Sequence, residues 1–243
     1  MADACFEDPR LAALYDRLEG ARPDLAAYLA MAGEFGAARI LDIGCGTGTL
    51  ACLLAERGAQ VVAVDPAAAS LEVARRKPHA ERVRWLLGDA LSALPVPAVD
   101  LVTMTGNVAQ VFLGDEEWDA LLRAVRAVLV PGGRLVFETR DPSRRAWQHW
   151  TRPGTHRVLE LPDEGRVEAW TDLLEVRPPL VSFRQHIRIG ADPVPLTSDS
   201  TLRFRTHEEV ERSLTGAGLV LDDVRDAPDR PGLELVFVAR RPT

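Results

Sequence analysis

Lysine is almost missing from this sequence of 243 residues: Lys77 is the only one, and arginine supplies the other basic side chains. Together with the abundant alanine, this indicates GC-rich coding, so the arginines are not taken as an anion-binding signal. Acidic residues outnumber basic ones by 36 to 29, which gives a formal net charge of −7. Because nucleic-acid binders usually carry basic patches, this balance argues against RNA or DNA as the bulk substrate.

Cysteine is also scarce, and the three present, Cys5, Cys45 and Cys52, form no C-x-x-C pair. They predict no disulfide framework and fit a reducing cytoplasm. The five histidines lack metal-ligand spacing, so no metal site is predicted. No apolar run reaches membrane-spanning length, and the acidic, polar start does not resemble a signal peptide. The remaining composition, 47% hydrophobic and 27% charged, is that of a soluble globular protein.

The most informative segment is a glycine-rich turn between an apolar run and an amphipathic pattern. The apolar run covers residues 40–43, and the three glycines that follow, Gly44, Gly46 and Gly48, occupy every second position. Leucines at helical spacing continue over residues 50–55. The pattern predicts a strand, a tight turn and a helix start, in which glycine permits positive φ and a close approach of a ligand.

Two acidic residues indicate which ligand the turn accepts. Asp65 ends the next apolar run, and a carboxylate at that strand tip can accept both hydroxyls of a ribose. The spacing is G-x-G-x-G, whereas dinucleotide sites favour G-x-G-x-x-G. Asp42 precedes the first glycine by two positions, where it would repel a phosphate and attract an ammonium group. S-adenosylmethionine, which has a ribose and an amino-acid ammonium but no phosphate, satisfies both ends.

With these motifs the chain resembles the class I S-adenosylmethionine-dependent methyltransferases. Residues 86–90 resemble that family's acidic motif after the third strand, and residues 100–107 resemble the fourth strand with its turn. Residues 129–138 resemble the Pro-Gly-Gly turn into strand five. The last helix and hairpin correspond to residues 208–224 and 233–239.

The resemblance implies a set of residues around S-adenosylmethionine. Asp89 would lie near the adenine amine, and Tyr15 near the sulfonium, although Tyr15 could equally be a core aromatic. Cys45 is interpreted as a small filler of the turn and not as a reactive thiol. The implied cofactor-binding residues are Tyr15, Asp42, Gly44, Cys45, Gly46, Asp65, Pro66, Asp89, Ala90, Thr105, Gly106 and Asn107.

Strand and helix patterns alternate along the chain and predict an α/β fold. We expect a doubly wound, seven-stranded, mostly parallel sheet with helices on both faces. Strands are expected near 39–43, 60–65, 83–87, 98–103 and 133–139, and helices near 48–57, 67–76 and 115–128. We expect an N-terminal helical lid at residues 1–35, the cofactor-binding domain at 36–140 and 204–243, and an inserted antiparallel β substrate cap at 141–203.

The inserted segment shows strand periodicity. Residues 166–176 and 181–189 alternate between apolar and polar side chains, and Pro178–Pro179 separates them. Residues 163–165, Asp-Glu-Gly, predict a hairpin turn, so the segment is predicted to be a meander of three or four strands. Thr206 and Glu209 form a capping-box pattern at the start of the last helix.

No general base is assigned from the sequence. His149 and His186 are candidates because they fall in the insertion, as are Glu138 and Asp141 around the end of strand five. Each of them also fits a plain polar role on a strand face or in a loop. Trp147 and Trp150 could line an acceptor pocket or could fasten the insertion to the main domain.

The predicted function is methyl transfer in the cytoplasm to an O or N atom of a small molecule. The turn Thr105-Gly106-Asn107 lacks the Pro-Pro-aromatic motif of enzymes that methylate nucleobase amines. The alternatives are an RNA or protein acceptor, an S-adenosylmethionine-binding protein without activity, and a nicotinamide-dependent dehydrogenase. The first is suggested by the arginine-bearing faces of the insertion, with Arg184, Arg188, Arg203 and Arg205. No membrane partner is predicted, and neither the acceptor nor the oligomeric state is assigned.

Overall fold

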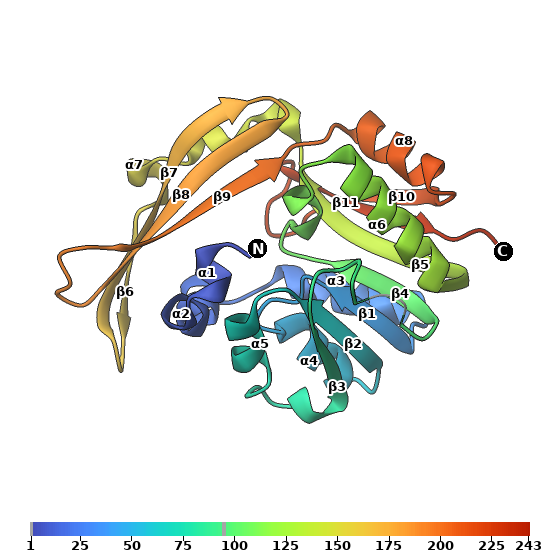
Figure 1. Ribbon diagram of the computed structural model, residues 1–243, viewed down its shortest axis with the longest axis horizontal. Coiled ribbons are helices and arrows are strands. Elements are labelled where there is room, and N and C mark those ends of the chain that lie inside the picture. Colours follow the sequence, from blue (N-terminus) through green and yellow to red (C-terminus); the bar gives the residue numbers. More distant parts are fainter. Residues whose placement is uncertain (1, 94–95) are drawn as a thin grey trace.

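The computed structural model describes residues 2–93 and 96–243. Met1, in the predicted lid, and residues 94–95, in the predicted cofactor-binding domain, lie outside the described residues. The described chain forms a large sheet covered by helices and a smaller, strongly curved sheet to one side of it (Figure 1). None of the helices in these two stretches is both long and apolar enough to span a membrane.

The large sheet has seven strands in the order β10-β11-β5-β4-β1-β2-β3. Strands β1 to β5 run parallel, and β11 is antiparallel to both of its neighbours. This topology confirms the predicted doubly wound, mostly parallel sheet. The strands are β1 (Arg39–Ile43), β2 (Gln60–Asp65), β3 (Val83–Leu87), β4 (Val99–Met104), β5 (Leu129–Arg140), β10 (Val220–Asp226) and β11 (Glu234–Arg240).

Helices cover both faces of this sheet. Helices α3 (Asp24–Glu34) and α4 (Thr49–Glu56) pack on one face, and α6 (Asp115–Val128) and α8 (His207–Gly216) on the other. Helix α6 has three acidic residues in its first turn, where the helix dipole favours negative charge. The buried residues of α6, which include Trp118, recur at helical spacing. The ring of Trp118 meets that of Phe137 edge-on, with the ring centroids 5.5 Å apart. The capping box predicted at the start of α8 is present.

Three short elements complete the main domain. Helix α5 (Ala68–Ala74) contacts β2 and β3, and the 3-10 turns η1 (Ala80–Arg82) and η2 (Val108–Val111) precede β3 and follow β4. Strand β5 begins earlier than the predicted residue 133, because Leu129 pairs with Val99 of β4 ahead of an irregularity in the ladder. The Pro-Gly-Gly sequence therefore lies within the strand.

The small sheet is the predicted antiparallel insertion, with four strands in the order β6-β7-β8-β9. Its hairpin turns fall at the predicted positions, after β6 and at Pro178–Pro179. The strands are β6 (Arg157–Leu161), β7 (Gly165–Arg177), β8 (Leu180–Ile189) and β9 (Leu196–Arg203), preceded by η3 (Pro142–Arg144), η4 (Ala146–His149) and α7 (Arg152–Thr155).

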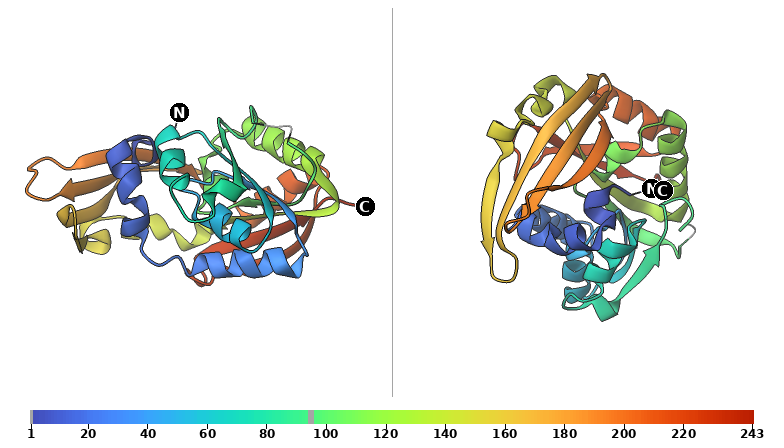
Figure 2. Two further views of the ribbon diagram at one scale, coloured as in Figure 1. Left: turned by 90° about the horizontal axis from the view of Figure 1, so that it is seen from below. Right: turned by 60° about the vertical axis from the view of Figure 1, so that its left-hand side comes forward.

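The N-terminal segment is divided between the two sheets. Helices α1 (Ala4–Glu7) and α2 (Pro9–Glu19) lie against the small sheet, where apolar residues of α2 pack against those of β7 and β8 (Figures 1 and 2). Helix α3, by contrast, belongs to the core of the large sheet. A lid role for the N-terminus therefore concerns α1 and α2 alone.

Two tryptophans join the small sheet to the chain that leads into it. The rings of Trp147 and Phe204 meet edge-on with their centroids 4.6 Å apart, and those of Trp150 and Phe183 with their centroids 4.7 Å apart. Both tryptophans pack with the buried cluster of β8 and β9. Of the two interpretations of this pair, the geometry favours fastening of the insertion over lining of an acceptor pocket.

Candidate functional site

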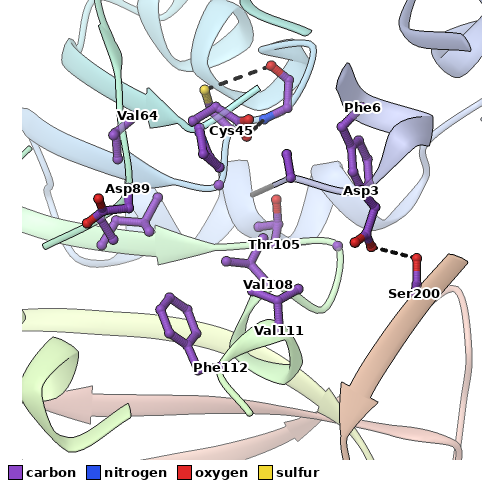
Figure 3. Close-up of a pocket in the computed structure, with 18 of the residues that line it drawn as sticks. Asp3, Phe6, Cys45, Val64, Asp89, Thr105, Val108, Val111, Phe112 and Ser200 are labelled. Carbon is purple, nitrogen blue, oxygen red and sulfur yellow. Dashed lines mark hydrogen bonds between the residues drawn. The ribbon is translucent and has the colours of Figure 1, made fainter. Parts of the chain in front are cut away.

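A cavity of about 770 Å³ lies where the carboxyl ends of β1, β2 and β4 face the small sheet. In open α/β sheets this edge is the usual place for a ligand. The cavity walls come from the glycine turn, the loops after β2, β3 and β4, the N-terminal helices and strands β8 and β9. Figure 3 shows how residues from these separate segments face one another across it.

All but two of the predicted cofactor-binding residues line this cavity. Asp42 and Asn107 are instead buried behind its wall, at 1% and 3% exposure. The lining residues from that set are Tyr15, Gly44, Cys45, Gly46, Asp65, Pro66, Asp89, Ala90, Thr105 and Gly106.

The three glycines of the turn serve different purposes. All three have positive φ, between 53° and 74°. A Cβ on Gly44 would meet Val108 at 2.5 Å, and one on Gly48 would meet Trp85 and Ala74. A Cβ on Gly46 would meet nothing within 4 Å, so it would extend into open space. Packing therefore demands Gly44 and Gly48, whereas Gly46 leaves its main chain accessible to a ligand.

Asp65 holds the glycine turn and also faces the cavity. One carboxylate oxygen accepts from the Gly46 amide at 2.7 Å, and the other accepts from the Ala67 amide at 2.8 Å. Burial nevertheless raises the pKa of this carboxyl. Because each carboxylate oxygen can accept two hydrogen bonds, one position on each oxygen remains for a ligand hydroxyl.

Asp89 and Cys45 differ in the state of their acidic groups. Asp89 is exposed at the rim, where backbone and hydroxyl donors of Ser92 and the Leu91 amide lower the pKa of its carboxyl. It is therefore a preorganised anion. Burial raises the pKa of the Cys45 thiol well above its usual value. The thiol stays protonated, which agrees with its interpretation as a filler.

Asp42 lies behind the turn and is fully enclosed. Thr103 donates to one oxygen at 2.8 Å, and the other oxygen has no hydrogen-bond partner among the described residues. Burial raises the pKa of the Asp42 carboxyl to about 7. A cationic ligand group near the turn would lower that pKa by favouring the carboxylate.

We expect Asp42 to make the ligand-free protein less stable as the pH rises. From about pH 4 to about pH 7 the native carboxyl keeps a proton that the unfolded chain has lost. The native state then binds more protons, so the free energy of unfolding falls through this range, by about 4 kcal/mol in total. In urea unfolding, the free energy of unfolding of Asp42→Asn should therefore rise relative to that of the wild type by about 4 kcal/mol between pH 4 and pH 8. A difference in the free energy of unfolding between the two proteins that stays constant with pH would contradict the raised pKa of the Asp42 carboxyl.

Glu138 holds the Thr105–Asn107 loop through hydrogen bonds to its backbone. One oxygen accepts from the Gly106 amide at 2.7 Å and the Asn107 amide at 3.1 Å, and Tyr28 donates to the other. Asn107 has a positive φ of 64°, and its side chain donates to buried Glu234. Since Glu138 is 4% exposed and does not line the cavity, its position is that of a loop support and not of a general base.

Removal of this carboxylate should destabilise the loop. Glu138→Ala leaves two amide donors without an acceptor, which we expect to cost about 3 kcal/mol in the free energy of unfolding. Glu138→Gln keeps an acceptor oxygen and should lose less than about 1.5 kcal/mol. Urea unfolding of both variants measures the difference. Equal losses in the two variants would show that the amide contacts contribute little.

The other three candidate bases also lie outside the cavity lining. Asp141 caps η3 by accepting from the Ser143 amide. His186 contacts Asp172 at 3.0 Å and stacks on Trp170, and His149 belongs to η4. Within residues 2–93 and 96–243, no group of three or more potential metal ligands is assembled.

Several lining residues were missed by the sequence analysis. They are Asp3, Phe6 and Arg22 from the N-terminal segment, and Ser182, Ser200 and Thr201 from the small sheet. Ser200 donates to Asp3 at 2.5 Å across 197 residues of sequence. No local pattern predicts a contact of such separation, although the expectation of a cap pointed to the small sheet as a source.

Comparison with known proteins reveals a clear likeness. A family model described as a methyltransferase domain matches residues 40–133. The cypemycin N-terminal methyltransferase of Streptomyces sp is 38% identical over 43% of this chain and 42% of its own. The trans-aconitate 2-methyltransferase of Delftia acidovorans is 32% identical over 74% of this chain and 65% of its own. The chain spans only 28% to 56% of the length of several curated relatives that it matches.

The fold is shared with solved structures over almost the whole chain. One is CalS10 from Micromonospora echinaspora, described as an amino pentose methyltransferase with bound SAM. It superimposes with a TM-score of 0.74 and 23% identity, covering 94% of this chain and 95% of that one. At this identity the likeness establishes the fold alone.

Proposed function

We propose that this chain is a class I S-adenosylmethionine-dependent methyltransferase, which transfers a methyl group from S-adenosylmethionine to an O or N atom of a small molecule. The observation that carries this proposal is the cavity in which the open side of Gly46 and the free acceptor positions of Asp65 meet. We also propose a cytoplasmic location, which the three free cysteines support.

The cavity has complementary groups for each part of S-adenosylmethionine. Asp65 would accept the ribose hydroxyls, and Asp89 at the rim would accept from the adenine amine. The enclosed carboxyl of Asp42 would favour the ammonium group. Arg22 lines the cavity and is held by Asp24. Its guanidinium would attract the carboxylate of the methionine part of the cofactor. These assignments add Arg22 to the set of residues predicted from the sequence.

The protein's contribution to the reaction is positioning. S-adenosylmethionine supplies a methyl group that its positive sulfur already activates. The chain has to hold an acceptor in line with the bond that breaks, and such orientation can supply roughly 7–11 kcal/mol. The rigid part of the site is the Thr105–Asn107 loop, anchored by Glu138. Tyr15, whose pKa is raised by burial, stays a neutral phenol at the cavity wall.

We propose roles for the other segments in line with this geometry. Helices α1 and α2 form the lid, since Phe6 and Tyr15 line the cavity with rings 5.4 Å apart. The small sheet forms the acceptor cap through β8 and β9. The large sheet and its helices form the cofactor-binding domain.

An RNA or protein acceptor finds less support. The arginines that suggested it are largely neutralised: Arg184 pairs with Asp199 at 2.6 Å, and Arg203 pairs with Asp115 at 2.7 Å. Arg205 is buried over the Trp118 ring and donates to backbone carbonyls. A continuous positive surface around the cavity is therefore not available from these residues.

Turnover tests the proposal. Purified protein with S-adenosylmethionine and a panel of small amines, alcohols and phenols should form S-adenosylhomocysteine with at least one acceptor class. The same panel with short RNA and protein extracts tests the alternative. A protein that binds the cofactor but methylates nothing across all panels would favour a binding protein without activity.

A further inference from the structure

The cavity extends well beyond the strand tips expected to hold the cofactor. Its far end is lined by Asp3 from the N-terminal segment and by Ser182, Ser200 and Thr201 of the small sheet. Figure 3 shows Asp3 and Ser200 on the side of Thr105 opposite Asp89. This end is polar and has room for a second molecule.

Apolar, accessible side chains also line the cavity. Val111 and Leu113, which follow β4, are 49% and 37% exposed, and Leu174 of β7 is 49% exposed. All three line the cavity. Exposed aliphatic side chains that line one cavity from two separate segments, the chain after β4 and strand β7, favour an apolar group as their occupant.

The charge of this end is negative and largely unopposed. Asp3 accepts from Ser200 and forms no ion pair with any described residue. Asp199 also lines the cavity, but two contacts from Arg184 neutralise it. Within the described parts of the chain, Arg22 is the one cation in the lining, and Asp24 holds it through contacts as short as 2.6 Å.

From these observations we propose that the methyl acceptor is a small amphipathic amine. Asp3 and Ser200 bind the nitrogen end, and Val111, Leu113 and Leu174 hold its apolar part. This inference rests on the proposed function and specifies its substrate class.

The charge movement of amine methylation suits this end of the cavity. The bound ammonium first releases a proton to water, which frees the nitrogen lone pair. That pair forms the new N–C bond while the C–S bond breaks, and its electrons stay on sulfur as a neutral thioether. The positive charge thus moves from sulfur to nitrogen, where Asp3 stabilises it. A carboxylate acceptor would instead bring a second anion beside Asp3.

The test uses three probes that share one hexyl chain: hexylamine, hexanol and hexanoate. The affinity of the protein for S-adenosylhomocysteine is measured first by calorimetry, and each probe is then titrated into the saturated complex. Hexylamine should bind at least tenfold more tightly than hexanoate. Asp3→Asn should weaken hexylamine binding by about 10- to 100-fold, as expected for loss of a hydrogen bond to a charged group. The affinity for S-adenosylhomocysteine should stay the same.

Glu7→Gln provides the matched control. It removes one negative charge from α1, the short helix that Asp3 precedes, but Glu7 is exposed and lies outside the cavity lining. It should leave hexylamine binding within about twofold, because exposed charges are screened. Equal or tighter binding of hexanoate, or unchanged hexylamine binding by Asp3→Asn, would overturn the inference. If S-adenosylhomocysteine itself does not bind, the proposed function fails instead.

Discussion

Asp65→Ala should lower the affinity for S-adenosylmethionine about a hundredfold, equivalent to roughly 2–4 kcal/mol. Among residues 2–93 and 96–243, this carboxylate is the one strand-tip group that both holds the glycine turn and retains acceptor positions toward the cavity. Its removal leaves the two ribose hydroxyls without a charged acceptor and frees the Gly46 amide. Isothermal calorimetry with S-adenosylmethionine measures the loss.

A matched control separates this contact from the general charge of the cavity. Asp199→Asn also removes a carboxylate from the lining, but on the small sheet, where Arg184 already neutralises it. We expect its affinity for S-adenosylmethionine to stay within about threefold of the wild type, since exposed ion pairs contribute little. An Asp65→Ala protein that is folded and binds within threefold would show that the ribose lies elsewhere.

Gly48→Ala should destabilise the protein by about 2–5 kcal/mol. Part of this cost is the left-handed conformation at φ 74°, about 1–2 kcal/mol for a residue with a Cβ. The rest arises because the new methyl group would meet the Trp85 ring, and Ala74 at 2.8 Å, and overpacking of a core typically costs about 1–3 kcal/mol. Urea unfolding without ligand measures the sum.

Gly46→Ala is the comparison for this variant. Its φ of 53° is also left-handed, but its Cβ would meet nothing within 4 Å. It should therefore lose only about 1–2 kcal/mol of stability. Its affinity for S-adenosylmethionine should fall because the methyl group occupies the open side of the turn. Equal stability losses at the two positions would contradict the division between packing and ligand glycines.

Local patterns sufficed to predict the elements that meet at the strand tips of the large sheet. Strand β1, the turn and α4 are contiguous in sequence, and their hydrophobic periods and glycine spacing express the geometry directly. Asp65 lies at the tip of β2 as expected. The alternating residues of the insertion likewise predicted the small sheet and two of its turns.

The far end of the cavity, around Asp3 and Ser200, could not be predicted in the same way. Asp3 and Ser200 meet because α1 packs against β9, a contact that depends on the whole fold. The burial of Glu138 under the loop was also hidden, because a glutamate in a strand gives no sign of which backbone amides it reaches. Asp42 was expected at the turn, whereas the structure encloses it behind the wall, where burial governs its protonation.

Calorimetric titration of the purified protein with S-adenosylmethionine and S-adenosylhomocysteine tests the central claim most directly. We predict binding of one molecule per chain, with a dissociation constant well below about 1 mM for both, and no comparable binding of a nicotinamide dinucleotide. Absence of binding of either adenosyl compound at millimolar concentration, or preferential binding of the dinucleotide, would contradict the claim that Asp65 and the glycine turn form an S-adenosylmethionine site.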